Sequence, residues 1–128
     1  MLLKSFNFFL SCLLLLLQFN ITYAQQPAID SMLQLLKTCK GDTNEVKILN
    51  ELSWELKNSN PDSAILISTN ALNISRTLDW ERGVAVSYNR LGVACRIKGN
   101  YALSSQYYLQ ALELFQKMKD DKVLENKN

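Results

Sequence analysis

The sequence predicts an all-α protein in which antiparallel helix pairs stack into a right-handed solenoid. Three observations favour this class. Apolar residues recur every three to four positions after Ala24, glycine and proline occur mainly where helices would begin or end, and the pattern of one helix pair returns further along the chain. The chain has 128 residues, which is enough for one domain or for part of one.

Composition narrows the possible functions. Apolar residues make up 48% of the chain and charged residues 20%, a balance that is typical of a globular protein. The net charge of +2 offers no basic field for a polyanion, so we expect no nucleic-acid partner. Histidine is absent, and no glycine pair has the spacing of a phosphate-binding loop. We therefore expect no catalytic residues, no cofactor and no metal site.

Residues 1–24 have the pattern of a secretory signal peptide. Lys4 is followed by the apolar run Phe8–Leu17, and Ala24 supplies a small residue at the expected cleavage point. Such a leader predicts an exported protein of the periplasm or cell envelope. An uncleaved membrane anchor remains the alternative, because no charged residue occurs between Ser5 and Ile29.

Two cysteines, Cys39 and Cys95, follow the predicted leader. An exported protein meets an oxidising compartment, so a disulfide between them is one possibility. The favoured interpretation is that both are small buried apolar residues.

Capping signals divide the rest of the chain into helices. Gly41 suits a helix end, and Asp42 with Glu45 three residues later resembles a capping box. Asn60 before Pro61 is a typical helix start. Asp79 is expected to cap the helix that begins at residue 80. The predicted helices span residues 27–38, 43–57, 61–78, 80–98 and 101–119, joined by short loops.

The last two predicted helices repeat the two before them. Leu91-Gly92 matches Leu52-Ser53, and Ala111 matches Ala71, at a spacing of about 40 residues. The expected division is a leader (1–24), an N-terminal helix (25–41), a degenerate repeat (42–79), a second repeat (80–119), and the start of a further repeat or a tail (120–128).

The second copy resembles the tetratricopeptide repeat family over residues 85–117. It has a large residue, then a Leu-Gly pair, and small and aromatic residues on the second helix, while residues 98–101 resemble the Gly-Asp-Tyr turn of the family. The motif residues of this copy are Tyr88, Leu91, Gly92, Cys95, Ser104, Tyr108 and Ala111. Those of the degenerate copy are Leu49, Leu52, Ser53, Leu56, Ala64, Ser68 and Ala71.

The resemblance implies a role for each group of residues. Small residues at the motif positions let neighbouring helices approach closely, and large ones fill the space between turns. The first helices of such pairs line a concave groove that binds an extended peptide, with Trp54 as an apolar platform and Lys57 and Arg96 for acidic groups. Alternatively, Trp54 packs against the N-terminal helix and the charges form a solvated surface. The groove residues implied are Lys47, Asn50, Trp54, Lys57, Val86, Asn89, Val93 and Arg96.

Three functions follow as hypotheses. The first is a non-catalytic protein-interaction module that binds a peptide or protein. The second rests on the resemblance, because the leader and the repeats are similar to the N-terminal periplasmic region of bacterial tetratricopeptide-repeat sensor histidine kinases and transcriptional regulators. An enzyme is the third and is disfavoured, since no convergent polar pocket is evident.

The end of the chain carries one further expectation. Val123-Leu124-Glu125 is typical of the opening of another helix, and Tyr107, Leu112 and Phe115 would leave apolar surface uncovered. We therefore expect the chain to be a fragment or to have this end covered by a partner.

Overall fold

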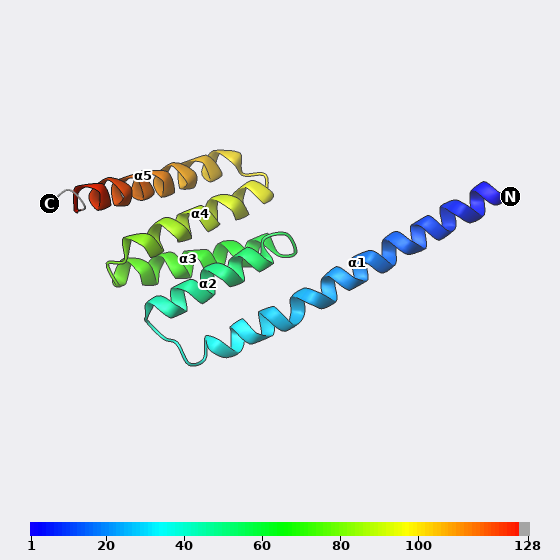
Figure 1. Cartoon of the computed structure of the whole chain (residues 1–128), viewed down its shortest axis with the longest axis horizontal. Coiled ribbons are helices and arrows are strands. Elements are labelled where there is room, and N and C mark those ends of the chain that lie inside the picture. Colours follow the sequence, from blue (N-terminus) through cyan, green and yellow to red (C-terminus); the bar gives the residue numbers. More distant parts are fainter. Residues whose placement is uncertain (126–128) are drawn as a thin grey trace.

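The fold comes from a computed structural model that describes the backbone of residues 1–125 and the side chains of residues 1–15 and 26–122. Within this part of the chain all regular secondary structure is helical, so the predicted all-α class is confirmed. The helices are α1 (Leu2–Leu35), α2 (Thr43–Leu56), α3 (Pro61–Thr77), α4 (Glu81–Ile97) and α5 (Tyr101–Glu125) (Figure 1).

Each helix packs mainly against the next one along the chain. Helices α2 to α5 run back and forth in sequence order, and α4 also contacts α2 (Figure 1). Helix α1 contacts α2 alone among the described helices, and its N-terminal half extends away from the others. The result is a repeat-like row of helices in which α2 with α3 and α4 with α5 form successive antiparallel pairs.

Several helix starts follow the predicted capping signals. The Glu45 amide donates to Asp42 Oδ1 at 2.8 Å, so the predicted N-cap of α2 is confirmed, whereas the Glu45 carboxylate accepts from the amide of Gly41 and not from that of Asp42 as in a complete capping box. At α3, Asn60 Oδ1 accepts from the Ser63 amide at 3.1 Å, with Pro61 as the first helical residue.

The predicted cap at Asp79 is wrong. Asp79 adopts a left-handed backbone conformation with φ of 50°, and the N-cap of α4 is Trp80, which makes no side-chain capping bond. The Trp80 amide instead donates to Ser75 O at 2.9 Å, which closes the end of α3. Asp79 thus ends α3 in a left-handed backbone conformation, just as Gly99, with φ of 84°, ends α4.

The predicted helix start at Pro27 is also wrong. Helix α1 continues through Pro27 without interruption, and Ser31 Oγ donates to Pro27 O at 2.9 Å. No glycine occurs between Leu2 and Leu35, and the fixed φ of proline is itself helical. The proline therefore removes one backbone hydrogen bond without ending the helix.

Small residues fill the contacts between the helices. Val46, Leu49 and Ala71 form a buried cluster, against which Leu36 and Trp80 pack from outside α2 and α3. A Cβ added at Gly92 would lie 2.8 Å from the Tyr108 ring, so only glycine fits where α4 meets α5. Of the predicted packing residues, Tyr88 and Tyr108 are half-buried, and the buried ones are Leu52, Ser53, Ala64, Ala71, Leu91, Gly92, Ser104 and Ala111.

Serine hydroxyls form hydrogen bonds between the two helices of each antiparallel pair. Ser53 Oγ donates to Ala64 O at 3.0 Å and is bonded to the Ser68 hydroxyl at 2.6 Å, which joins α2 to α3. Ser104 Oγ donates to Gly92 O at 2.8 Å, which joins α5 to α4. Ala64 and Gly92 lie inside their helices, so each hydroxyl uses the second lone pair of a carbonyl that its helix already engages.

The cysteines are free in the described part of the chain. Cys95 is buried in α4 with 2% of its surface exposed, whereas Cys39 in the loop after α1 is half-buried. The interpretation of two buried cysteines therefore holds for Cys95 alone.

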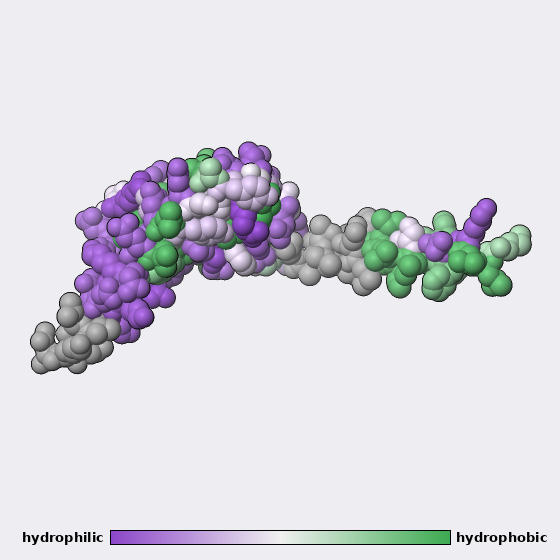
Figure 2. All heavy atoms as spheres, turned by 90° about the horizontal axis from the view of Figure 1, so that it is seen from above, coloured by the Kyte–Doolittle hydropathy of each residue, from purple (hydrophilic) through white to green (hydrophobic). Residues whose placement is uncertain are grey.

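The N-terminal half of α1 presents bare apolar side chains. Leu2 is 89% exposed and Phe9 74% exposed, and Figure 2 shows this apolar end projecting from a more hydrophilic body. Among the described helices, none is both long enough and apolar enough to span a bilayer.

Candidate functional site

A cleft lies between α2 and α4, on the side where these two helices contact each other. Its volume is about 330 Å³. Residues from the middle of α2 form one wall, and the N-terminal half of α4 with the residue before it forms the other. The lining residues are Lys47, Asn50 and Glu51 on one side and Trp80, Arg82, Gly83, Val86 and Arg90 on the other.

Asn50 is the most buried polar side chain of this cleft, with 3% of its surface exposed. Its Nδ2 donates to Ser87 Oγ at 3.1 Å, which links α2 to α4. Its Oδ1 is buried and accepts no hydrogen bond from any described residue. A buried acceptor without a donor costs about 1–3 kcal/mol of stability.

Arg90 crosses from α4 to α2. Its Nη2 donates to Glu51 Oε1 at 3.3 Å, while its Nε is buried without an acceptor among the described residues. The guanidinium carbon lies 4.6 Å from the centre of the Trp54 ring, and Lys57 Nζ lies 3.7 Å from the same centre. Two cations therefore contact Trp54, which is still 37% exposed.

Trp80 and Gly83 shape the other end of the cleft. A Cβ at Gly83 would overlap the Trp80 ring and the Ser75 hydroxyl, so glycine is required for the close approach of α4 to α3. Lys47 Nζ lies 5.9 Å from the centre of the Trp80 ring. The indole therefore forms an apolar wall with a cation over its ring.

The charges of the cleft are predominantly positive. Lys47, Arg82 and Arg90 face a single carboxylate, that of Glu51, which Arg90 already pairs with. Such a site attracts a group with negative charge.

Only some of the predicted groove residues lie at the cleft. Lys47, Asn50 and Val86 line the cleft, and Trp54 and Lys57 lie beside it through their contacts with Arg90 and with each other. The remaining three do not line it. They lie along one side of α4 and are Asn89, Val93 and Arg96.

Sequence reasoning missed Glu51, Arg90, Trp80, Arg82 and Gly83 as members of the site. One signal was available. Arg90 and Glu51 stand at matching positions in the two copies of the repeat, so the pair joins equivalent positions of neighbouring helices. Asn50 of α2 bonds to Ser87 of α4 at a separation of 37 residues, close to the 39 residues that separate Glu51 from Arg90.

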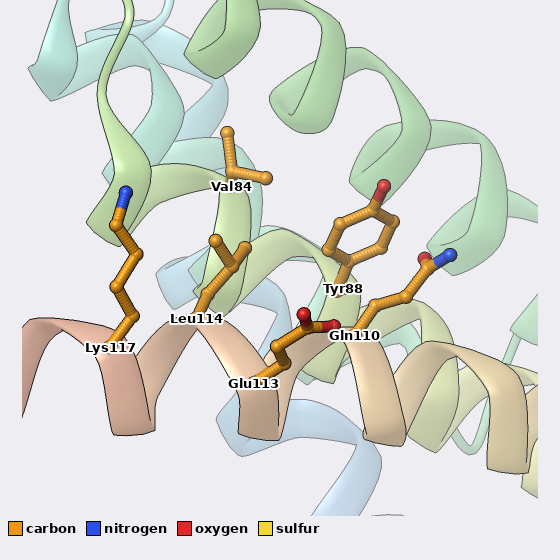
Figure 3. Close-up of a pocket in the computed structure, with 6 residues that line it drawn as sticks. All are labelled: Val84, Tyr88, Gln110, Glu113, Leu114 and Lys117. Carbon is orange, nitrogen blue, oxygen red and sulfur yellow. The ribbon is translucent and has the colours of Figure 1, made fainter.

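A larger hollow of about 520 Å³ lies between α4 and α5. Figure 3 shows Val84 and Leu114 facing each other across it and Tyr88 beside Gln110. Tyr88 accepts a hydrogen bond from Arg76, and Lys117 at one end pairs with Glu81. Its polar groups are thus partly engaged already, which makes it the weaker candidate for ligand recognition.

Searches for similar proteins add no further guidance. No family model, curated protein or solved structure matches the chain significantly. Within the described residues, no cluster of three or more cysteine, aspartate or glutamate side chains could hold a metal ion.

Proposed function

We propose that this chain is a non-catalytic interaction module of the tetratricopeptide repeat type, whose cleft between α2 and α4 binds an extended acidic peptide. The observation that carries this proposal is the charge of the cleft, in which Lys47, Arg82 and Arg90 face the single carboxylate of Glu51.

The cleft suits the rest of such a ligand. Val86 and the Trp80 ring offer apolar surface, and Lys47 and Arg82 line the cleft where they can meet a ligand carboxylate. A peptide that lies across α2 and α4 would thus be selected by its charge.

The repeated contacts within the two helix pairs support a right-handed solenoid as the architecture. Gly92 occupies in the second copy the position that Ser53 has in the first, and Ser104 likewise takes the position of Ala64. Both pairs are joined by a serine-to-carbonyl bond between these equivalent positions. A family that packs helix pairs through small residues at fixed positions accounts for this equivalence.

Binding of two short fluorescein-labelled peptides to the full chain tests the proposal. One peptide carries four aspartates and the other four lysines in their place. We expect the acidic peptide to bind more tightly, and Lys47→Ala to weaken it by roughly tenfold because one charge-assisted hydrogen bond of about 1.5 kcal/mol is lost. Lys119→Ala, a change of the same kind at an exposed position of α5 outside the cleft, is the matched control. Equal binding by both peptides, or by Lys47→Ala and the parent chain, would contradict the proposal.

A role as the sensory input region of an exported signalling protein is the second candidate. It is favoured by the signal-like pattern of residues 1–24 and by the exposed apolar side chains at the start of α1. In this case the chain is periplasmic or attached to the cell envelope. The mass of the mature protein tests export, since cleavage after Ala24 removes the leader, and reading the gene beyond Asn128 tests for a kinase or DNA-binding output domain.

A further inference from the structure

We infer that the cleft between α2 and α4 recognises an extended segment in which an acidic residue and an apolar residue stand two positions apart. The inference rests on the peptide-binding role proposed above, and it specifies the side-chain pattern of the ligand. Three lining residues of α4 carry it, namely Arg82, Val86 and Arg90. They follow one another at intervals of four residues, so they form a single row along the helix.

The spacing of this row matches that of an extended chain. Four residues of an α-helix rise by about 6 Å, so Val86 lies about 6 Å along α4 from Arg82 and from Arg90. In an extended segment, the side chains of one face recur every two residues, about 6.6 Å apart. A segment that runs along α4 in either direction therefore presents alternate side chains to the three members of the row.

The N-terminal end of the row is the place for the acidic residue. Lys47 of α2 contacts Trp80 at this end, with its Nζ 5.9 Å from the centre of the indole ring, and Arg82 lines the same end of the cleft. Neither cation forms an ion pair with any residue that the structure describes. A ligand carboxylate therefore meets two cations that have no other acidic partner.

The acidic residues that adjoin these two cations in the sequence are directed elsewhere. The Glu45 carboxylate accepts a hydrogen bond from the Gly41 amide, and Glu81 pairs with Lys117 of α5. Asp79 lines a separate hollow that α5 borders. The positive charge at this end of the cleft is therefore not neutralised by its neighbours.

The middle of the row takes the apolar residue. Val86 is half-buried between the positions of the two arginines, and the Trp80 ring adds to the apolar surface of the same wall. An aliphatic side chain placed against Val86 removes apolar surface from water, which a charged side chain at that place does not.

At the C-terminal end of the row the chain supplies its own acid. Arg90 Nη2 donates to Glu51 Oε1 at 3.3 Å, and the guanidinium carbon lies 4.6 Å from the centre of the Trp54 ring. A ligand carboxylate that reached Arg90 would replace the carboxylate already there, so a second acidic residue gains little. The ligand therefore needs one acidic residue rather than two.

Two isomeric peptides test the spacing. One contains Leu-Ser-Asp-Ser-Leu and the other Ser-Leu-Asp-Leu-Ser, each flanked by glycines and labelled with fluorescein for anisotropy titrations with the full chain. They have the same charge and composition, but only the first places aspartate and leucine on one face of an extended segment. We expect the first to bind at least fivefold more tightly in either direction, because a leucine stands on both sides of the aspartate.

Val86→Thr in the full chain removes the apolar middle of the row with almost no change in volume. We expect this variant to bind both isomers equally, while it still prefers the four-aspartate peptide over the four-lysine peptide. Val84→Thr is the matched control, because Val84 is also half-buried on α4 but lines the hollow beside α5 instead. It should keep the preference of the parent chain, and circular dichroism checks that both variants are folded.

Glu51→Gln tests the role of the built-in carboxylate. The peptides here contain Asp-Ser-Leu-Ser-Asp, or the same sequence with asparagine in place of either aspartate. The second aspartate should tighten binding to Glu51→Gln at least fivefold more than it tightens binding to the parent chain. Glu55→Gln, the same change one turn further along α2 and outside the lining of the cleft, should behave like the parent chain.

Equal or undetectable binding of the two isomers to the parent chain would overturn the inference, and so would equal losses of preference in Val84→Thr and Val86→Thr. A second aspartate that helps the parent chain as much as Glu51→Gln would overturn the role of Glu51. If the isomers do not differ while the four-aspartate peptide still binds more tightly than the four-lysine peptide, this inference fails and the proposed function stands. If the four-aspartate peptide has no advantage either, the proposed function fails with it.

Discussion

Ser53 and Ser104 make the same interhelical hydrogen bond in opposite directions. In the first pair, Ser53 of α2 donates to Ala64 O of α3 at 3.0 Å. In the second, the hydroxyl stands on the other helix, and Ser104 of α5 donates to Gly92 O of α4 at 2.8 Å. The contact between these two positions is thus kept although the residue that supplies the hydroxyl is exchanged.

We expect Ser104→Ala to lower the free energy of unfolding by about 1 kcal/mol, because a buried hydrogen bond is lost with little change in packing volume. Urea denaturation followed by circular dichroism measures the change. Ser105→Ala is the control, since Ser105 is exposed and bonds only within its own helix, to Tyr101 O at 2.9 Å. An equal loss in both variants would contradict the role assigned to Ser104.

Gly92→Ala should cost more, about 1–3 kcal/mol, because the added methyl group overlaps the Tyr108 ring. The thermal midpoint reports this loss. A double variant with Tyr108→Ala removes the ring that clashes, so the cost of Gly92→Ala should fall in that background. If the two changes are simply additive, the close contact is not the cause.

Asp79→Gly should stabilise the chain by up to about 1 kcal/mol, since a left-handed backbone is unfavourable for residues with a Cβ and aspartate tolerates it only in part. Gly99→Ala, at the equivalent turn after α4, should have the opposite effect. Chemical denaturation of both variants checks the pair of signs, and a loss of stability in Asp79→Gly would refute the prediction.

Cys95 should react slowly with maleimides in the folded protein. Burial raises the pKa of its thiol above the ordinary value of 9.0, although Lys98 opposes this. Cys39 is half-buried in a loop and should be labelled first, as mass spectrometry of timed samples would show. Faster labelling of Cys95 than of Cys39 would be inconsistent with the packing of α4.

The raised pKa of Cys95 also makes the stability of the chain depend on pH. The folded chain holds the Cys95 proton more tightly than the unfolded chain does, so the stability due to this group is complete below pH 9.0 and is lost as the pH rises through the higher folded pKa. Cys95→Ala should flatten this part of the pH profile, measured by urea denaturation at several alkaline pH values.

Local signals predicted much of the fold. The N-cap at Asp42 and the Asn60–Pro61 start involve residues within four positions of each other, so the sequence alone could place the beginnings of α2 and α3. The predicted cap at Asp79 was wrong because its side chain is typical of an N-cap, whereas its backbone takes the left-handed conformation that ends α3. The predicted helix start at Pro27 was wrong because the helix already continues through the residues before this proline.

The site was harder to predict because its contacts join residues distant in sequence. The family resemblance pointed to Lys47, Asn50 and Val86, which do meet in the cleft. It could not show that Arg90 reaches back to Glu51 and Trp54, since this depends on how far a long side chain extends across a packed interface. Nor could it show that one oxygen of Asn50 is left without a donor, because that needs the positions of all its neighbours.

The order of packing, in which each helix mainly touches the one before and the one after, bears on how the chain folds. Contacts between residues near in sequence need little loop closure, so low contact order and rapid folding are expected. Tension applied at the two ends would detach the outermost helix first and the next one after it, so the chain would lengthen in steps and could shorten again along the same path.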